Sequence, residues 1–319
     1  NQSGVTGEFV TGRYTYSASV KDSAGNYNAT EIRTIDIDNN PQQINFINPT
    51  PANLTSTTNT SILINVSIPE IYLNEVKFNW NNTNYTLYND SLVLMMNFEN
   101  NSALGENDSY VADLSKYGNN GNVSGARWNS SGGRYGGAYQ FNGSGSYIAL
   151  TSAPDVSSTG SFTYSLWLKI DDYSSGDFFI DRTTGTLNLI SLTASGTNYL
   201  FQIRYDDGTG LGGPVGGTIT GGWHYITMIR EYNINFRLYI DGINVANLTD
   251  SGSKPLTAPI TKLGGHATDP TASLNGSIDE FRIYNYSLSA SEVYELYASN
   301  LMKFNQTQWY LTVNQSGVT

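Results

Sequence analysis

The sequence has 319 residues, of which 39% are hydrophobic and only 13% charged, and its net charge is −11. This length allows more than one domain, while the acidic balance disfavours nucleic acids and anionic membranes as partners, because both are bound through basic residues. Cysteine is absent, which excludes disulfides and thiolate metal sites, and no apolar run reaches the ~20 residues of a membrane-spanning helix.

A hexapeptide, Asn-Gln-Ser-Gly-Val-Thr, occurs at residues 1–6 and again at residues 314–319. Such an identity is typical of a tandem array, of which the chain represents one unit plus a short overlap. Residues 308–313 alternate like a strand and run into the second hexapeptide, and residues 13–20 follow the first. We therefore expect the end of one unit and the start of the next to form neighbouring strands of one β-domain. The alternative is a single copy that is circularly closed.

Short alternating segments separated by turns fill residues 13–91. Residues 22–26 carry a turn signal, and residues 38–41 carry a linker signal. Residues 61–68 alternate, which places Ile62, Ile64, Val66 and Ile68 on one face. Together with residues 303–319, these segments predict a β-sandwich.

Residues 92–300 read as a separate β-unit. Residues 162–170 alternate with apolar side chains on one face, and Asp241-Gly242 predicts a two-residue hairpin turn. One helix is expected near residues 289–298, because Ser289 and Glu292 form a capping-box pair.

Six ordered stretches of this unit resemble the laminin-G-like, concanavalin A-like jelly-roll family. They are residues 92–98 (LVLMMNF), 111–123 (VADLSKYGNNGNV), 136–143 (GGAYQFNG), 162–168 (FTYSLWL), 238–242 (LYIDG) and 276–284 (GSIDEFRIY). The flanking parts are similar to immunoglobulin-like repeats of archaeal surface-layer-type proteins, through residues 12–16 (GRYTY), 22–26 (DSAGN) and 34–38 (TIDID).

The resemblance implies an all-β chain in which a two-sheet jelly-roll sandwich is inserted into an immunoglobulin-like β-sandwich, with one short helix near 289–298. Residues 1–38 would be the end part of an immunoglobulin-like domain, and residues 39–91 the first part of the next. Residues 92–300 would form the laminin-G-like jelly roll, and residues 301–319 would continue the immunoglobulin-like domain into the next repeat.

We expect no enzymatic activity. Glycanases with this type of fold place carboxylates at alternate strand positions so that they project into one groove. Here Asp279 and Glu280 are adjacent, and strand geometry predicts that they point to opposite faces.

Calcium is the expected cofactor, as a structural ion. The resemblance implies a site near Asp113, Asn119 and Asp279, and calcium takes carboxylate and amide oxygens as ligands. The alternative is that Asp113 and Asn119 only cap turns and that Asp279 ends a strand.

Asn-x-Ser/Thr sequons are numerous and predict N-linked glycans on an exported protein. The candidate asparagines are Asn28, Asn53, Asn59, Asn65, Asn81, Asn84, Asn89, Asn100, Asn107, Asn122, Asn129, Asn142, Asn247, Asn275, Asn285, Asn305 and Asn314.

The sequence therefore predicts a structural repeat unit of a long secreted glycoprotein that forms an extracellular filament, stalk or surface layer. Its partners would be neighbouring copies of the same repeat. The alternative is a carbohydrate-binding adhesin module at the cell surface, with surface glycans as partners and calcium dependence. The sequence does not reveal which residues would bind a glycan.

Overall fold

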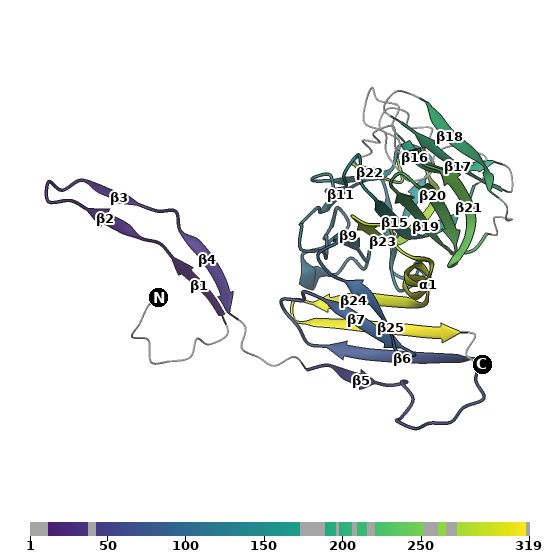
Figure 1. The fold of residues 1–319 in the computed structure, drawn as a ribbon, viewed down its shortest axis with the longest axis horizontal. Coiled ribbons are helices and arrows are strands. Elements are labelled where there is room, and N and C mark those ends of the chain that lie inside the picture. Colours follow the sequence, from purple (N-terminus) through teal and green to yellow (C-terminus); the bar gives the residue numbers. More distant parts are fainter. Residues whose placement is uncertain are drawn as a thin grey trace. The chain divides into compact units, whose positions relative to one another are not determined.

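A computed structural model describes residues 12–37, 43–172, 189–195, 198–205, 209–215, 221–251, 261–265 and 273–316. The chain divides into two compact units, residues 1–44 and residues 45–319 (Figure 1). The division at residue 44 lies near the boundary expected after residue 38. The boundaries expected at residues 91 and 300 fall inside the second unit, and the predicted linker at 38–41 is outside the described residues.

Residues 12–37, the strand-forming described part of the first unit, form an antiparallel ribbon of two paired hairpin arms. Strand β1 (Gly12–Tyr16) pairs with β4 (Arg33–Ile37), and β2 (Ser19–Lys21) pairs with β3 (Tyr27–Ala29). The predicted turn joins β2 to β3, because Asp22 Oδ1 accepts hydrogen bonds of 2.9 Å and 2.8 Å from the backbone N–H groups of Ala24 and Asn26.

A jelly-roll-like β-sandwich makes up most of the second unit. Its eight-stranded sheet consists of β9 (Leu92–Met96), β12 (Arg127–Asn129), β13 (Ala138–Asn142), β15 (Phe162–Ile170), β19 (His224–Glu231), β20 (Asn235–Ile240), β21 (Ile243–Thr249) and β23 (Asn275–Tyr284). The order is β12-β13-β23-β15-β19-β20-β21, and β9 also pairs with β23.

Two smaller sheets accompany it. One contains β10 (Tyr110–Val111), β11 (Gly121–Ser124), β14 (Tyr147–Leu150) and β22 (Lys262–Leu263), and the other contains β16 (Leu189–Ser195), β17 (Asn198–Arg204) and β18 (Gly210–Val215). A short 3-10 helix, η1 (Ser102–Leu104), follows β9.

Alternation in β15 builds the jelly-roll core, as predicted. Phe162, Tyr164, Leu166, Leu168 and Ile170 all belong to one cluster of buried side chains shared with β19, β20 and β23. Burial of each such side chain contributes roughly 1.5–3 kcal/mol.

The predicted turn and helix start are both confirmed. Asp241 and Gly242 have positive φ angles of 50° and 79°, which the two-residue turn between β20 and β21 requires. Helix α1 (Ala290–Ala298) begins after Ser289, whose side chain and that of Glu292 form the reciprocal capping box. No described helix is long and apolar enough to cross a membrane.

A four-stranded sheet combines distant parts of the chain in the order β24-β25-β6-β5 (Figure 1). Its strands are β5 (Asn45–Ile47), β6 (Ser61–Ile68), β24 (Ser299–Asn305) and β25 (Gln308–Ser316), and a hairpin of β7 (Val76–Trp80) and β8 (Thr83–Tyr88) accompanies it. The jelly roll thus lies in the chain between β8 and β24.

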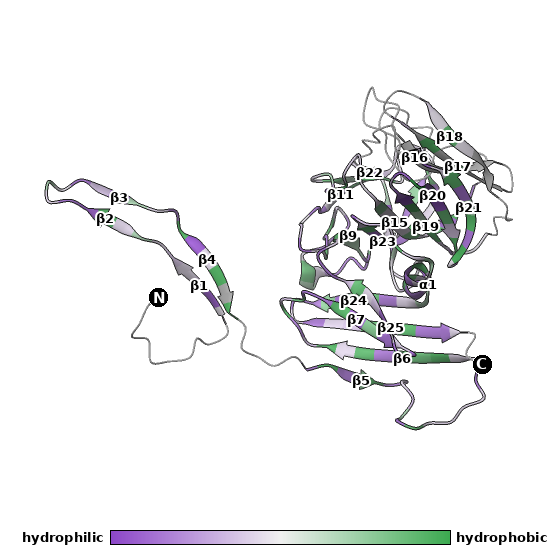
Figure 2. Cartoon of the chain, in the orientation of Figure 1, coloured by the Kyte–Doolittle hydropathy of each residue, from purple (hydrophilic) through white to green (hydrophobic). Residues whose placement is uncertain are grey.

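The jelly roll and the four-stranded sheet share one core. Val66, Trp309 and Leu311 of the four-stranded sheet belong to the same buried cluster as Trp167 and Tyr225 of the eight-stranded sheet. Leucine and valine side chains of α1 complete this cluster. Burial alternates along β6 and β25 for this reason, because one face packs on the core and the other meets solvent. Figure 2 shows apolar and polar residues mixed along these strands.

Candidate functional site

Strand β23 contains a β-bulge at Glu280. Ser165 of β15 lies opposite Arg282, whereas Trp167 lies opposite Asp279, so β23 carries one extra residue between these pairs. Glu280 adopts a positive φ of 53°. The bulge therefore breaks the alternation of side chains along β23.

The two carboxylates of the bulge lie on the same face. Ile278 and Phe281 on either side of them both belong to the jelly-roll core, which leaves the opposite face of the sheet for Asp279 and Glu280. The expectation that these adjacent residues point to opposite faces is therefore wrong, because it assumed a regular strand.

Glu280 is held by a buried polar network. Its Oε2 accepts hydrogen bonds of 2.5 Å from Asn97 Nδ2 and 2.9 Å from Arg282 Nη2. Asn97 Nδ2 also lies 3.2 Å from the carbonyl oxygen of Leu301. Glu280 and Arg282 are each 2% exposed, so their ion pair is removed from water and depends on these partners.

A glycine-rich loop, residues 131–137 (SGGRYGG), closes over Asp279. The backbone N–H of Tyr135 donates a hydrogen bond of 3.0 Å to Asp279 Oδ2. A Cβ atom at Gly133 would lie 2.9 Å from this oxygen and 2.1 Å from the carbonyl oxygen of Gly137. The close approach of the loop to the carboxylate thus requires glycine at position 133.

The same loop also covers Glu99, which follows β9. The N–H of Gly137 lies 3.3 Å from Glu99 Oε2, and a Cβ atom at Gly136 would lie 2.6 Å from the same oxygen. Gly136 also has a φ of +69°. The loop therefore holds Glu99 and Asp279 through backbone contacts that need glycine.

Burial dominates the electrostatics of these carboxylates. It raises the pKa of Glu99 to about 7, with a smaller contribution from the charge of Glu106. Burial is the largest cause of the raised pKa of Asp279, and the negative charge of Glu280 is the second. Burial also raises the pKa of Glu280, while Arg282 and Asn97 oppose that shift.

Three oxygens in this region are buried without a hydrogen-bond partner: Asp279 Oδ1, Glu280 Oε1 and Asn97 Oδ1. A buried polar atom without a hydrogen bond carries a desolvation cost. The region is therefore a polar site enclosed between the eight-stranded sheet and the glycine-rich loop.

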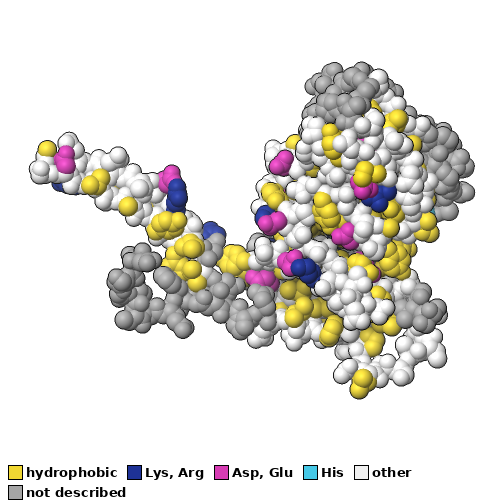
Figure 3. All heavy atoms as spheres, viewed as in Figure 1, with side chains coloured by type: hydrophobic (Ala, Val, Ile, Leu, Met, Phe, Trp, Pro, Cys, Tyr) yellow, Lys and Arg dark blue, Asp and Glu magenta, His cyan; other side chains and the backbone are white. Residues whose placement is uncertain are grey.

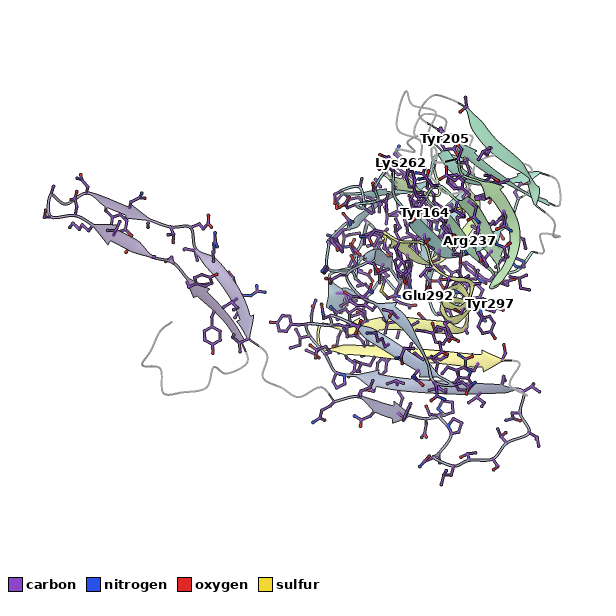
Figure 4. All side chains as sticks on the ribbon, in the orientation of Figure 1. Tyr164, Tyr205, Arg237, Lys262, Glu292 and Tyr297 are labelled. Atoms are coloured by element: carbon purple, nitrogen blue, oxygen red, sulfur yellow. The ribbon has the colours of Figure 1, made fainter. Side chains whose placement is uncertain are left out.

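An aromatic patch, which we define as Arg134, Tyr135, Trp167 and Tyr297, lies beside the carboxylates. The guanidinium of Arg134 lies 5.2 Å from the ring centre of Tyr135 and 4.8 Å from that of Trp167. The rings of Trp167 and Tyr297 are 5.6 Å apart, and Tyr297 is carried by α1 (Figure 4). Arg134 is exposed and both tyrosines are half-buried, so the patch reaches the surface.

The structure brings together two of the three predicted calcium ligands. Asp113 Oδ2 accepts a hydrogen bond of 2.8 Å from the N–H of Asn119. Asp279, the third predicted ligand, forms no hydrogen bond with Asp113 or Asn119. It accepts one from the backbone N–H of Tyr135 in the glycine-rich loop. Among the described residues, no group of three or more His, Cys, Asp or Glu side chains is arranged to hold a metal ion.

Asp113 does not fit a calcium site. Its two oxygens accept hydrogen bonds from the N–H groups of Met95, Ser115 and Asn119 and from the hydroxyl of Ser115. Asn119 Oδ1 already accepts a bond of 2.6 Å from the Ser152 hydroxyl. A cation at this place would have to displace these donors. Asp279 retains one oxygen without a partner, which is a ligand type that calcium takes.

The predicted glycosylation sites all lie at the surface. None of the seventeen asparagines belongs to the buried class, and eleven are exposed: Asn28, Asn53, Asn59, Asn81, Asn84, Asn107, Asn122, Asn142, Asn247, Asn285 and Asn314. Charged side chains are sparse on the face that Figure 3 shows. Occupancy of these sequons stays a prediction.

Glu99, Glu280 and Arg134 were missed as site residues. The sequence feature that could have indicated this site is the pair of Gly-Gly steps in residues 131–137. Glycines grouped in this way indicate that the backbone approaches other groups closely. What the loop approaches, however, depends on residues far away in the sequence.

Comparison with known proteins identifies the jelly roll. Residues 142–294 match the laminin G-type family described as the concanavalin A-like lectin/glucanases superfamily. No curated protein matches the sequence.

Solved structures of similar fold include the following three. The binding domain of Paraclostridial Mosquitocidal Protein 1 has a TM-score of 0.52 and 19% identity, over 67% of this chain and 54% of that one. Domain 4 of the extracellular arabinanase AbnA from Geobacillus stearothermophilus, solved with arabinotriose, has a TM-score of 0.51 and 23% identity, over 65% and 98% of the two chains. The ligand-binding domain of botulinum neurotoxin serotype D, solved with N-acetylneuraminic acid, has a TM-score of 0.51 and 16% identity, over 65% and 50%.

The chain spans about half the length of the two toxin domains, at 54% and 50%, and nearly all of the arabinanase domain, at 98%. These likenesses concern the fold. Residues 142–294 are thus similar to the concanavalin A-like lectin/glucanases superfamily, and the fold around them is concanavalin A-like.

Proposed function

We propose that the concanavalin A-like domain is a non-catalytic carbohydrate-binding module of an extracellular protein. The match of residues 142–294 to the lectin/glucanase superfamily carries this proposal. Two proteins of similar fold were solved with arabinotriose and with N-acetylneuraminic acid, which supports sugars as the class of ligand.

The burial of the carboxylates supports binding without hydrolysis. A glycosidase needs an acid and a second carboxylate on either side of the scissile bond. Asp279 is 0% exposed and Glu280 is 2% exposed, and Glu280 is already paired with Arg282. A sugar at the surface would reach neither group.

The aromatic patch is the surface we propose for sugar contact. Tyrosine rings offer flat apolar faces for the C–H groups of a sugar ring, and the guanidinium of Arg134 offers directed donors to its hydroxyls. The half-buried rings of Tyr135 and Tyr297 are fixed by packing against Trp167, at 6.1 Å and 5.6 Å between ring centres. A patch held in this way loses little conformational entropy on binding.

A glycan array followed by titration calorimetry tests this function. Arg134→Ala and Tyr297→Ala are expected to weaken binding by about tenfold or more, the effect of removing a well-placed contact. Tyr117→Ala is the matched control, because Tyr117 is a tyrosine of the same domain that is 43% exposed and lies outside the patch. Absence of glycan binding, or release of cleaved sugar, would contradict the proposal.

We propose a second function for the whole chain, a structural repeat unit of an extracellular filament, stalk or surface layer. The recurrence of the hexapeptide at residues 1–6 and 314–319 favours it. Neighbouring copies of the repeat would then be its partners, and N-linked glycans with Asn, Ser and Thr side chains would keep the surface soluble in place of charge. We propose a structural calcium ion with Asp279 as a ligand, and none at Asp113.

The intact mass of the native protein, together with electron microscopy, tests the structural function. A mass of several repeats and a regular step along a fibre are the expected results. A native protein that contains a single copy would overturn it.

A further inference from the structure

Arg134 is the positively charged member of the aromatic patch. Its guanidinium lies 5.2 Å from the ring centre of Tyr135 and 4.8 Å from that of Trp167. Within the part of the chain that the structure describes, the side chain of Arg134 forms no hydrogen bond or ion pair besides these ring contacts. Arg134 is exposed, so a ligand from solvent can reach the N–H donors of its guanidinium.

Carboxylates around the patch are engaged by other donors. Asp279 accepts a hydrogen bond of 3.0 Å from a backbone N–H of the glycine-rich loop, and Glu280 is paired with Arg282 at 2.9 Å. Asp241, in the turn between β20 and β21, lies 2.7 Å from His224 Nδ1. Among the described residues, none of these three carboxylates forms an ion pair with the guanidinium of the patch. The positive charge of the patch can therefore pair with an anion from outside the chain.

The two rings hold the guanidinium in place. The rings of Tyr135 and Trp167 are 6.1 Å apart and nearly perpendicular, at an interplanar angle of 81°, and the guanidinium lies close to both. Trp167 is 3% exposed, so its ring is fixed by the packing of β15. An arginine stacked on fixed rings is already ordered before a ligand binds, which reduces the conformational entropy that binding costs.

The charge of Arg134 acts on the tyrosines of the patch. Burial raises the pKa of Tyr135, and the positive charge of Arg134 opposes that shift. Burial and then the charge of Asp241 raise the pKa of Tyr297, and Arg134 opposes the shift there as well. The guanidinium therefore lies near the phenol groups of both half-buried tyrosines. A cation and the accessible rings belong to one surface.

Helix α1 extends this surface away from the cation. The ring of Tyr297 is 5.6 Å from that of Trp167 and 6.2 Å from that of Tyr294, one helical turn earlier. A Cβ atom at Gly242 would lie 3.3 Å from Cδ2 of Tyr294 and 3.5 Å from Cδ1 of Tyr297. The turn between β20 and β21 thus supports both tyrosines from one side. A flat aromatic surface lies beside a single positive charge.

A carboxylate fits this arrangement better than a sugar hydroxyl does. The guanidinium is planar, and its parallel N–H donors match the two oxygens of a carboxylate. Hydrogen bonds between ionised partners are about twice as strong as those between neutral ones. Uronic and sialic acids carry a carboxylate on a ring whose C–H groups are apolar, so one residue of such a sugar can contact the cation and an aromatic ring together.

The net charge of −11 does not prevent such binding. At physiological ionic strength the Debye length is about 8 Å, so charges elsewhere on the surface are largely screened from the patch. The contact between carboxylate and guanidinium is shorter than this distance and is screened less. The interaction is therefore local, and it is expected to weaken as salt is added.

We propose that the ligand of this domain is an acidic carbohydrate, in which the carboxylate of a uronic or sialic acid residue pairs with the guanidinium of Arg134 and the sugar ring lies on Tyr297. This inference rests on the carbohydrate-binding function proposed above. It adds the class of sugar and the contact that selects it. Neutral sugars then bind through the rings alone and more weakly.

Paired glycans test the selection. An array carries oligosaccharides with uronic acid residues and others with sialic acid residues, each printed beside its carboxyl-reduced counterpart, in which a hydroxymethyl group replaces the carboxylate. Titration calorimetry then measures the affinities of the best pair. The acidic form is expected to bind about tenfold or more tightly than the reduced form, the effect of one bidentate charged contact. Only the acidic form should lose affinity as salt is raised. The two sets of oligosaccharides distinguish uronic from sialic acids.

Three variants assign the effect to Arg134. Arg134→Gln removes the charge and is expected to bring the ratio of the two affinities close to one, mainly by weakening the acidic form. Arg134→Lys keeps the charge without the planar fork, so an intermediate ratio is expected. Arg127→Gln is the matched control, because Arg127 is an exposed arginine of β12 in the same domain and lies outside the patch. It should leave the ratio unchanged.

The outcomes separate this inference from the function on which it rests. Equal affinity for the acidic and reduced forms, or a ratio that Arg134→Gln leaves unchanged, overturns the selection of acidic sugars while carbohydrate binding stands. Absence of binding to every acidic and reduced glycan on the array overturns both.

Discussion

Gln315 donates a hydrogen bond of 2.6 Å to Glu295, which joins strand β25 to helix α1. Both side chains are buried, at 2% and 3% exposure. Burial raises the pKa of Glu295, and the bond from Gln315 opposes that shift. The repeated hexapeptide is thereby tied to the helix that closes the jelly roll.

Removing this donor is expected to destabilise the second unit. Gln315→Ala leaves the Glu295 carboxylate buried without its partner, which costs about 1.5–3 kcal/mol for a bond to a charged group. The free energy of unfolding in urea measures the loss. Asn314→Ala is the control, since Asn314 is the exposed neighbour in the same strand. Equal stability of the two variants would show that the bond contributes nothing.

The glycine-rich loop gives a second prediction. Gly136→Ala places a Cβ atom 2.6 Å from Glu99 Oε2 at a backbone φ of +69°. The backbone conformation alone costs about 1–2 kcal/mol for a residue with a Cβ atom. The urea midpoint is expected to fall for Gly136→Ala and to stay unchanged for Gly221→Ala, where no atom lies within 4 Å of the added Cβ. A similar midpoint for both would mean that the loop adapts freely.

Stability is expected to depend on pH through Glu99. Burial raises the pKa of Glu99 from 4.5 to about 7 in the folded chain. The folded state therefore binds a proton that the unfolded state releases between these values, so this group's contribution makes stability fall as pH rises from about 4.5 to about 7. Glu99→Gln is neutral throughout and should flatten this part of the profile. Unfolding in urea at a series of pH values checks it, and an unchanged slope would contradict the assignment.

Calcium is expected to act through Asp279 and not through Asp113. Added calcium is expected to raise the melting temperature of the unmodified chain, and Asp279→Asn is expected to remove this increase. Asp113→Asn lowers stability with or without calcium, because the carboxylate accepts hydrogen bonds from Met95, Ser115 and Asn119. Asp155→Asn is an exposed control. An increase lost in Asp113→Asn but kept in Asp279→Asn would reverse the assignment.

We expect a sequon to stay unmodified when the side-chain amide of its asparagine is hydrogen-bonded in the folded chain, and to carry sugar when the asparagine is exposed. Asn65 is half-buried, and its Nδ2 donates to the carbonyl oxygen of Asn48 at 3.2 Å. Asn81 is exposed in the turn between β7 and β8. Glycopeptide mass spectrometry of the native protein is expected to find sugar on Asn81 and none on Asn65. The opposite pattern would mean that glycans are added without regard to the folded contacts.

The sequence predicted the fold correctly where the structure of a segment depends only on residues within that segment. The limits of β15, the turn at Asp241-Gly242 and the cap at Ser289 follow from alternation, from positive φ and from side-chain capping. Each of these depends on residues only a few positions apart.

The site could not be predicted in the same way. The bulge at Glu280 exists only in the register with β15, and Asn97 reaches Glu280 across 183 positions in the sequence. The predicted calcium ligand Asp113 was read from a local motif, which does not show that its carboxylate accepts hydrogen bonds from three backbone N–H groups. The geometry of the site therefore depends on pairing between strands that are distant in the sequence, and neighbouring residues alone do not predict it.

The order of strands in the four-stranded sheet has a mechanical consequence. The chain enters through β5 at Asn45, opposite Ser67, and leaves through β25 at Ser316, opposite Ser61. Because β5 and β25 both run antiparallel to β6, tension on the chain pulls them in opposite directions along β6. Their backbone hydrogen bonds are then loaded in shear and resist together, instead of opening one after another. The jelly roll, inserted between β8 and β24, lies outside this direct path, and β25 transmits load to it through contacts with α1 such as the bond between Gln315 and Glu295.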